Sequence, residues 1–161
     1  MDCIVNSVHG VQGDRITALD RAFELAGRLA ELMQEALAAR GLTVSQAHVL
    51  HALDDAGPLV QRQIAERLRR TPRHVTTLVD ALESAGLVTR AAHPTDRRAT
   101  LVALTKNGQT ATARMRAERT AAAEALLADS TPSDLAGFVA TADALLRRLD
   151  DLVGEPSKDG A

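Results

Sequence analysis

The chain has 161 residues, of which 45 % are apolar and 25 % are charged, and its net charge is −2. This composition fits one folded domain, with or without an oligomerising extension, and excludes a chain that is disordered throughout. Phe23 and Phe138 are the only aromatic residues. Their scarcity argues against stacking on single-stranded nucleic acid and predicts a core of Leu, Val and Ala, which favours helices.

Several kinds of protein are not indicated by the sequence. No apolar run approaches the roughly 18 residues that a membrane span needs, and no basic leader precedes an apolar block. The single cysteine, Cys3, excludes an intrachain disulfide. The sequence has no glycine-rich phosphate loop, no Gly-x-Ser-x-Gly motif and no clustered metal motif. We therefore expect a cytoplasmic protein without membrane contact that is not an enzyme and needs no cofactor.

Basic residues are concentrated in the middle of the chain. Nine basic and four acidic residues lie between Pro58 and Lys106, which gives this segment a net charge of +5. The remaining ten basic and seventeen acidic residues give the rest of the chain −7. A basic segment within an acidic protein is typical of a module that binds a polyanion.

Residues 1–13 have no clear period and predict a flexible N-terminal tail. The pattern becomes helical over residues 14–40, where two adjacent apolar stripes run along the sequence and Gly41 ends the helix. Two stripes on one helix indicate burial on two sides, with a second chain covering one of them. One stripe contains Ile16, Leu19, Phe23, Ala26, Ala30, Met33 and Leu37, and the other Ala22, Leu25, Leu29, Leu32 and Ala36.

Residues 42–105 predict a compact lobe. Thr43 or Ser45 caps a helix that Gly57-Pro58 ends. A short helix over 62–70 is followed by Thr71-Pro72, a helix start with Thr as the N-cap and Pro at the first helical position. That helix continues to Ala85, and residues 87–90 and 99–104 alternate like two strands of a ribbon, the wing. The order is that of a winged helix-turn-helix, a mainly α fold with a small β-ribbon.

Two helices are predicted after the wing, within residues 106–153, and a polar tail follows over 154–161. The second of these helices begins at Ser130-Thr131-Pro132 and carries one continuous apolar stripe. The stripe contains Leu135, Phe138, Ala142, Leu145, Leu149 and Leu152. We expect a single domain over 14–153 in which residues 14–40 and 106–153 form the dimerisation helices of a homodimer.

The helix that begins at Thr71 is the candidate recognition helix. When its apolar side chains face inward, Arg73, His74, Thr76 and Thr77 face outward. Arginine can read guanine with two hydrogen bonds, and threonine can bind a base edge or contact a thymine methyl group. The N-terminus of the helix and Thr71 can also meet a phosphate. An ordinary amphipathic helix in water is the alternative explanation.

The turn of the wing carries Asp96, Arg97 and Arg98. An arginine at such a tip can enter a narrow A·T-rich minor groove, where the negative potential is enhanced. Asp96 and Arg98 lie two apart on one strand and can pair on the same face, so the carboxylate can orient the arginine. A turn aspartate beside two solvated arginines is the alternative.

The segment LVDALESAGLVTRAAHPTDRRATLVALTKNG, residues 78–108, closely resembles the central part of the MarR family of bacterial transcriptional regulators. The order of helices extends this resemblance over about 14–153. It implies an obligate dimer that binds pseudo-palindromic double-stranded DNA and commonly represses until a small molecule or an oxidant releases it. It further implies major-groove or phosphate contacts by Pro72, Arg73, Thr76 and Thr77. It also implies that Asp96 orients Arg98 in the minor groove, and that Arg97 contacts phosphate. Thr76 stands where many members carry arginine.

The signal that would release the protein from DNA is less evident in the sequence. Cys3 is a candidate redox residue, because some members of the family sense peroxide through a cysteine near the first helix. His48 and His51 share a helix face and are candidates for lining a ligand pocket; no metal site is predicted. A thiol- or metal-responsive sensor of the same fold, and a winged helix that docks proteins without binding DNA, remain alternatives.

Overall fold

The computed structural model describes residues 3–92 and 100–154, with the side chains of residues 13–92 and 100–152. It divides into two compact units, Met1–Arg114 and Met115–Ala161. The sequence predicts a single domain over residues 14–153. The boundary between the two units falls inside a continuous helix, α5 (Lys106–Leu126), where no glycine, proline or change of period marks it in the sequence.

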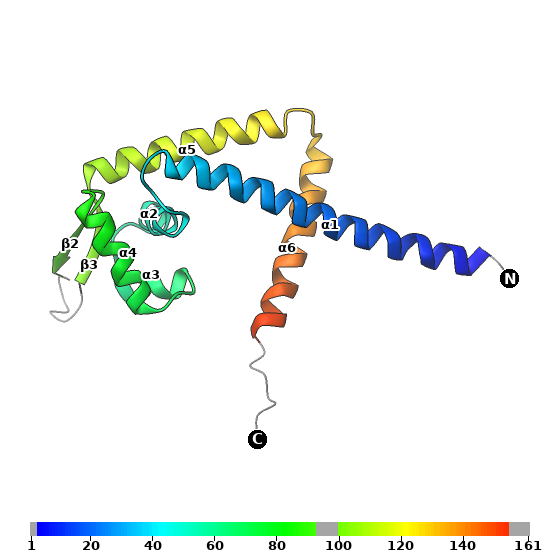
Figure 1. Ribbon diagram of the computed structural model, residues 1–161, viewed down its shortest axis with the longest axis horizontal. Coiled ribbons are helices and arrows are strands. Elements are labelled where there is room, and N and C mark those ends of the chain that lie inside the picture. The colour runs from blue at the N-terminus through cyan, green and yellow to red at the C-terminus, as the bar shows by residue number, and fades with distance from the viewer. Residues whose placement is uncertain (1–2, 93–99, 155–161) are drawn as a thin grey trace, which may run out of the picture. The chain divides into compact units, whose positions relative to one another are not determined.

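The first helix, α1, runs from Cys3 to Ala38 and begins well before the predicted start at Asp14 (Figure 1). The structure assigns residues from Cys3 onward to this helix, whereas the sequence shows no clear period over residues 1–13. The segment contains Gly10 and Gly13, which each cost a helix about 1 kcal/mol relative to alanine. It contains no proline, so nothing in it terminates a helix that continues from the strongly periodic residues that follow.

The helix-turn-helix consists of α2 (Val44–Ala56), α3 (Gln61–Arg67) and α4 (Pro72–Ser84). Thr43 is the N-cap of α2: its hydroxyl accepts from the N–H of Gln46 at 3.2 Å, and the side chain of Gln46 accepts from the N–H of Thr43 at 2.8 Å. This reciprocal pair is a capping box. The sequence leaves Thr43 and Ser45 as alternatives, and the structure selects Thr43.

The short helix α3 ends at Arg67, earlier than the predicted Arg70. The reason is the backbone of Arg69, which is in the left-handed region with φ 49°. The N–H of Arg69 donates to the carbonyl of Glu66 at 3.2 Å, and that of Arg70 donates to the carbonyl of Ala65 at 2.9 Å. These bonds close the helix as a left-handed residue at its C-terminus commonly does, although glycine is the usual residue there.

A three-stranded antiparallel sheet completes the lobe, in the order β1-β3-β2. Its strands are β1 (Leu59–Val60), β2 (Val88–Ala92) and β3 (Thr100–Leu104). The pairs Leu59 with Val102, and Val88 with Leu104, set the register on the two sides of β3. The two predicted strands of the wing are β2 and β3. Strand β1 was not predicted, because two residues are too few to show an alternation.

The core of the lobe is aliphatic and is shared by all its elements. Figure 1 shows α2, α3 and α4 grouped beside the β2–β3 ribbon. Burying one such side chain contributes roughly 1.5–3 kcal/mol, so the shared core dominates the stability of the lobe. The fully buried residues of the lobe with the largest side chains are Leu50, Ile64, Leu82, Val49, Val75, Val79, Val88 and Val102, and Thr112 of α5 is also fully buried.

The last helix, α6 (Pro132–Gly154), starts where the sequence predicts. The hydroxyl of Thr131 accepts from the N–H of Asp134 at 3.2 Å, and the carboxylate of Asp134 accepts from the hydroxyl and the N–H of Thr131. These hydrogen bonds from Thr131 hold the pKa of Asp134 below its usual value. Among the described helices, none is long and apolar enough to cross a membrane.

Gly108 joins the start of α5 to the turn that follows α4. A Cβ atom at this position would lie 2.0 Å from the carbonyl oxygen of Leu87. Beside it, Thr105 donates its N–H to the carbonyl of Leu87 at 3.0 Å and its hydroxyl to that of Gly86 at 2.7 Å. The backbone after α4 is therefore held against the first turn of α5.

Gly108→Ala is expected to destabilise the protein by roughly 1–3 kcal/mol, because the new methyl group overlaps backbone that cannot give way cheaply. Urea denaturation of both proteins measures the difference in the free energy of unfolding. Gly27→Ala in α1 is the matched control, since nothing lies within 4 Å of a Cβ placed there. The control should be neutral or gain up to about 1 kcal/mol. Equal stability of Gly108→Ala and wild type would contradict the close approach.

Candidate nucleic-acid interface

Helix α4 has one buried face and one exposed face. Val75, Val79 and Leu82 are fully buried, and Leu78 is nearly so. The exposed face at the N-terminal end contains every recognition-helix residue that the sequence predicts. These exposed residues are Thr71, Pro72, Arg73, His74, Thr76 and Thr77.

The N-terminus of α4 is capped as the Thr71-Pro72 pair predicts. Thr71 has an extended backbone and its hydroxyl accepts from the N–H of His74 at 3.3 Å, while Pro72 occupies the first turn. The cap satisfies one of the free N–H groups that begin a helix. The other free N–H groups of this first turn face outward with the positive end of the helix dipole, which is a favourable place for a phosphate.

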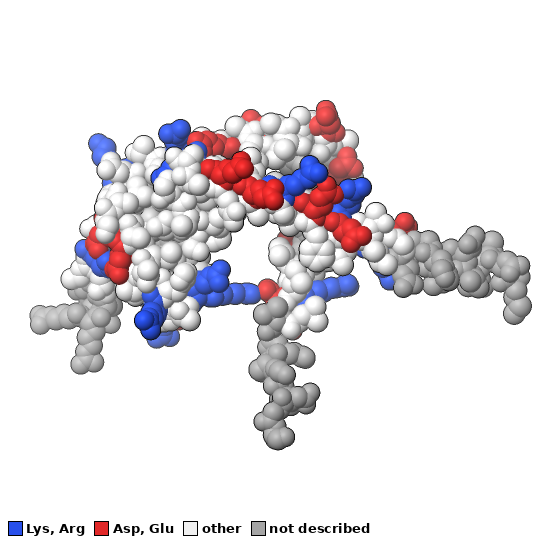
Figure 2. Space-filling model, viewed as in Figure 1, with Lys and Arg blue, Asp and Glu red and all other residues white. Residues whose placement is uncertain are grey.

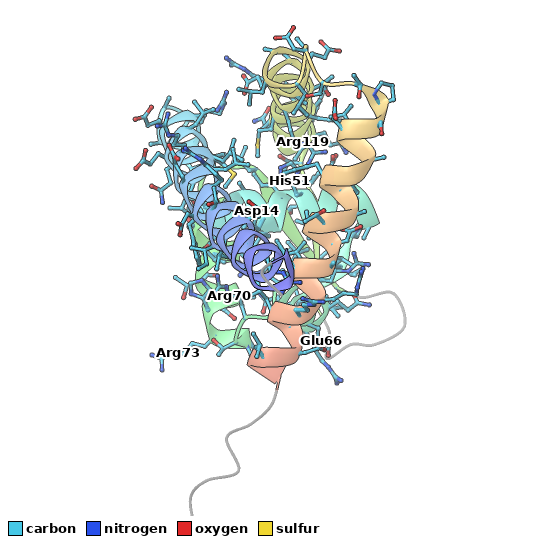
Figure 3. The ribbon with its side chains drawn as sticks, turned by 90° about the vertical axis from the view of Figure 1, so that its right-hand side faces the viewer. Asp14, His51, Glu66, Arg70, Arg73 and Arg119 are labelled. Atoms are coloured by element: carbon cyan, nitrogen blue, oxygen red, sulfur yellow. The ribbon has the colours of Figure 1, made fainter. Side chains whose placement is uncertain are left out.

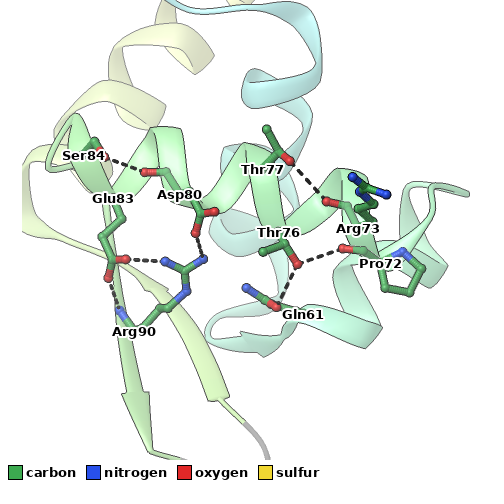
Figure 4. A network of polar contacts seen from close by, with 9 residues as sticks. All are labelled: Gln61, Pro72, Arg73, Thr76, Thr77, Asp80, Glu83, Ser84 and Arg90. Carbon is green, nitrogen blue, oxygen red and sulfur yellow. Dashed lines mark hydrogen bonds and ion pairs between the residues drawn. The ribbon is translucent and has the colours of Figure 1, made fainter.

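The two exposed threonines of α4 use their hydroxyl hydrogens within the protein. Thr76 donates to the carbonyl of Pro72 at 3.0 Å and lies 3.4 Å from the side-chain oxygen of Gln61, and Thr77 donates to the carbonyl of Arg73 at 3.3 Å (Figure 4). Their hydroxyl oxygens can still accept, and both residues are exposed. Such a threonine suits a donor on a base edge or the methyl group of thymine.

Basic side chains gather around the helix-turn-helix. Figure 2 shows Lys and Arg side chains along the edge formed by α3 and α4, while many Asp and Glu side chains of the same face follow α1. In Figure 3, Arg73 points away from α4 into solvent. Arg62 donates to Glu66 at 2.8 Å, which raises the pKa of Arg62. The basic residues of this cluster are Arg62, Arg67, Arg69, Arg70 and Arg73.

A second charged contact joins α4 to the wing. The guanidinium of Arg90, on β2, donates to Asp80 at 2.5 Å and to Glu83, and the N–H of Arg90 donates to Glu83 at 3.1 Å (Figure 4). Burial lowers the pKa of Arg90, but its hydrogen bonds to both carboxylates outweigh burial and leave the pKa raised. Sequence reasoning missed this contact. The sequence pattern that could have indicated this contact is a pair of carboxylates three residues apart on one helix, followed by an arginine on the inward face of a strand.

The wing tip cannot be placed. Asp96, Arg97 and Arg98 lie outside the described residues, so their pairing and direction stay predictions. The arms that carry them, β2 and β3, are described up to Ala92 and from Thr100.

The structure describes the side chains of two of the three candidate sensor residues. His48 is exposed on α2 and His51, on the same helix, is half-buried. Cys3 begins α1, but its side chain is not among those described. Among the described residues, no group of three or more His, Cys, Asp or Glu side chains is placed to hold a metal ion.

A pocket of about 320 Å³ lies within the first unit, beside the turn after α4. Its polar lining comes from Arg40, Asn107, Thr110 and Arg114, and neither His48 nor His51 contributes to it. Leu87, whose carbonyl is bonded to the N–H of Thr105, also lines it. The pocket therefore adjoins the backbone that links α4 to the wing.

A helix-turn-helix followed by an antiparallel ribbon, with a basic exposed surface on its second helix, is the architecture of a winged-helix protein. Residues 42–100 match the family model described as MarR family. The match spans α2, α3, α4 and β2 and ends at the first residue of β3.

Relatives of known structure and sequence agree with this fold. The HTH-type transcriptional repressor MdtR of Bacillus subtilis (strain 168) is 37 % identical over 76 residues, which cover 47 % of this chain and 49 % of that protein. The chain thus matches about half the length of its curated relatives. The MarR family transcription regulator SP03579 superposes with a TM-score of 0.83 at 19 % identity, over 93 % of this chain and 99 % of that one. Streptococcus pneumoniae FabT in complex with DNA superposes with a TM-score of 0.77 at 20 % identity, over 86 % and 98 % of the two chains.

Thr71→Ala is expected to destabilise the protein by about 1 kcal/mol, because it removes the acceptor that caps α4. Thermal or urea denaturation measures the change. Thr71→Ser retains the hydroxyl and should recover most of the lost stability. If the alanine and serine variants were equally stable, the hydroxyl would not be acting as the cap.

Proposed function

We propose that this chain is a dimeric, sequence-specific regulator of transcription that binds double-stranded DNA. On this proposal it acts in the cytoplasm as a repressor that a small-molecule ligand releases. The likeness to MdtR, which is described as a repressor, supports the repressing role.

The observation that carries the proposal is the exposed N-terminal half of α4. Arg73, His74, Thr76 and Thr77 all lie outside a helix whose opposite face is fully packed. The positions that can read bases are thus held on a rigid element, and the surrounding arginines supply attraction to phosphate. The likeness in fold to FabT, solved in complex with DNA, agrees with this use of the surface.

In the proposed complex each protomer uses two grooves. The exposed side of α4 enters the major groove, and Arg98 at the wing tip enters the adjacent minor groove with Asp96 orienting it. Arg97 contacts phosphate. Two-fold symmetry then requires a pseudo-palindromic operator with half-sites about one helical turn, roughly 10 base pairs, apart.

Two exposed apolar stripes support a homodimer. On α1, Ile16 and Phe23 are 57 % and 70 % exposed in the isolated chain, and on α6 Leu149 and Leu152 are 54 % and 77 % exposed. Apolar surface of this extent along whole helices is uncommon on a monomer. A second copy of the chain offers the same stripes and can cover them in an isologous interface.

The pocket beside the turn after α4 supports control by a small ligand. Its volume of about 320 Å³ suits a small organic molecule. Arg40 and Arg114 in its lining favour an anion. His48 and His51 remain the sequence-based candidates for a different ligand site.

Fluorescence anisotropy with DNA selected from random or genomic fragments tests DNA binding. The wild type should bind the selected sequence with an affinity that falls steeply as salt rises. Arg73→Ala should lose roughly 1–3 kcal/mol of binding free energy and relax the base preference at one position of each half-site.

Arg28→Ala is the matched control for Arg73→Ala, because it removes an exposed arginine of α1 that lies outside the basic segment. It should leave affinity and base preference unchanged. Arg98→Ala should weaken binding and flatten the preference for A·T pairs next to the major-groove site. Absence of salt-dependent binding by the wild type would instead favour a protein-docking module.

Leu149→Glu on the apolar stripe of α6 should convert the dimer to monomers, because it buries a charge at the interface. Light scattering after size-exclusion chromatography measures the mass. Ala140→Glu places the same side chain on the opposite face of α6, where it should leave the dimer intact. An unchanged mass for both variants, or a monomeric wild type, would exclude this interface.

A further inference from the structure

Arg90 makes a contact of a different kind from the other described ion pairs of the DNA-binding lobe. Arg62 and Glu66 lie one turn apart on α3, with side chains 85 % and 60 % exposed. Such a pair contributes little to stability. Arg90 instead joins two elements, β2 and α4, and its side chain is 24 % exposed. It uses both its guanidinium and its backbone N–H.

The strand alternation explains why Arg90 faces α4. Val88 is buried, and residues two apart on a strand share a face, so Arg90 points to the same side. Asp80 and Glu83 lie three apart on α4 and therefore project from neighbouring positions on its surface. A guanidinium is planar and has several donors, so it can hold both carboxylates at once, which a lysine cannot do with comparable geometry.

The two carboxylates are costly on a DNA-binding helix. Asp80 and Glu83 are 59 % and 39 % exposed, on the same helix as Arg73 and Thr77. An anion near the phosphate backbone repels it and lowers affinity for any DNA sequence. Arg90 offsets one of these two negative charges and hydrogen-bonds both carboxylates, and its own donors are directed at α4. This arrangement therefore indicates that Arg90 orients α4 and β2 and does not bind phosphate.

We propose that Arg90 is a positioning residue for DNA recognition, which with Asp80 and Glu83 fixes the wing relative to the recognition helix. This inference rests on the proposed DNA-binding function. When the contact is intact, α4 and the β2–β3 ribbon meet two adjacent grooves as one body. When it is broken, the ribbon must be ordered during binding, and that ordering costs affinity for the cognate site.

Glu83→Gln tests the proposal, because the two possible roles of the carboxylate predict opposite signs. If Glu83 only repels phosphate, the neutral amide should strengthen binding to every DNA. If it positions the wing through Arg90, affinity for the selected operator should fall about tenfold while affinity for random-sequence DNA stays equal or rises. Arg90→Lys keeps the charge but loses the contact with both carboxylates. It should therefore also lower the affinity for the selected operator, by a smaller factor than Glu83→Gln does.

Glu66→Gln is the matched control, since it breaks an arginine–glutamate pair within one helix of the same lobe. It should leave the ratio of operator to random-sequence affinity unchanged. Melting temperatures without DNA are measured for every variant. Equal or tighter operator binding by Glu83→Gln overturns the inference and leaves the proposed function standing. An equal loss of both affinities that follows a fall in melting temperature also overturns it, because the role would then be structural. A wild type that binds no DNA overturns both.

Discussion

The burial of one face of α4 is the interaction on which the candidate interface depends. Val75, Val79 and Leu82 have no exposed surface, and each contributes roughly 1.5–3 kcal/mol on burial. The exposed hydrogen bonds of Thr76 contribute about 1 kcal/mol or less. Apolar burial therefore decides the rotation of the helix about its own axis, and this rotation puts Arg73 in solvent.

Other contacts act at the two ends of the same helix and have different consequences. The cap at Thr71 sets where the helix starts, so it sets which N–H groups remain free. Arg90 holds the far end against β2 and so sets the angle between helix and wing. The turn at Leu87 joins this arrangement to α5, and the pocket with Arg114 in its lining adjoins that turn. A ligand there would act on backbone that both elements share.

Much of the lobe was predictable because its determinants are local. The Thr71-Pro72 pair, the buried face of α4 and the alternation in the wing depend on neighbours within a few residues, and the structure confirms each. The start of α1 was not predictable, because residues 3–13 show no clear period although the segment is helical. Strand β1 exists only because β3 lies beside it.

By itself the sequence determined the order of the elements, the inward side chains of each and the concentration of positive charge between Pro58 and Lys106. These properties follow from periodicity, capping and composition, which short stretches of chain carry. Only the tertiary structure decided that Arg90 would hold Asp80 and Glu83, that Gly108 would touch Leu87, and that a two-residue strand would complete the sheet. Such contacts depend on the distance between elements, and packing of the whole core sets that distance.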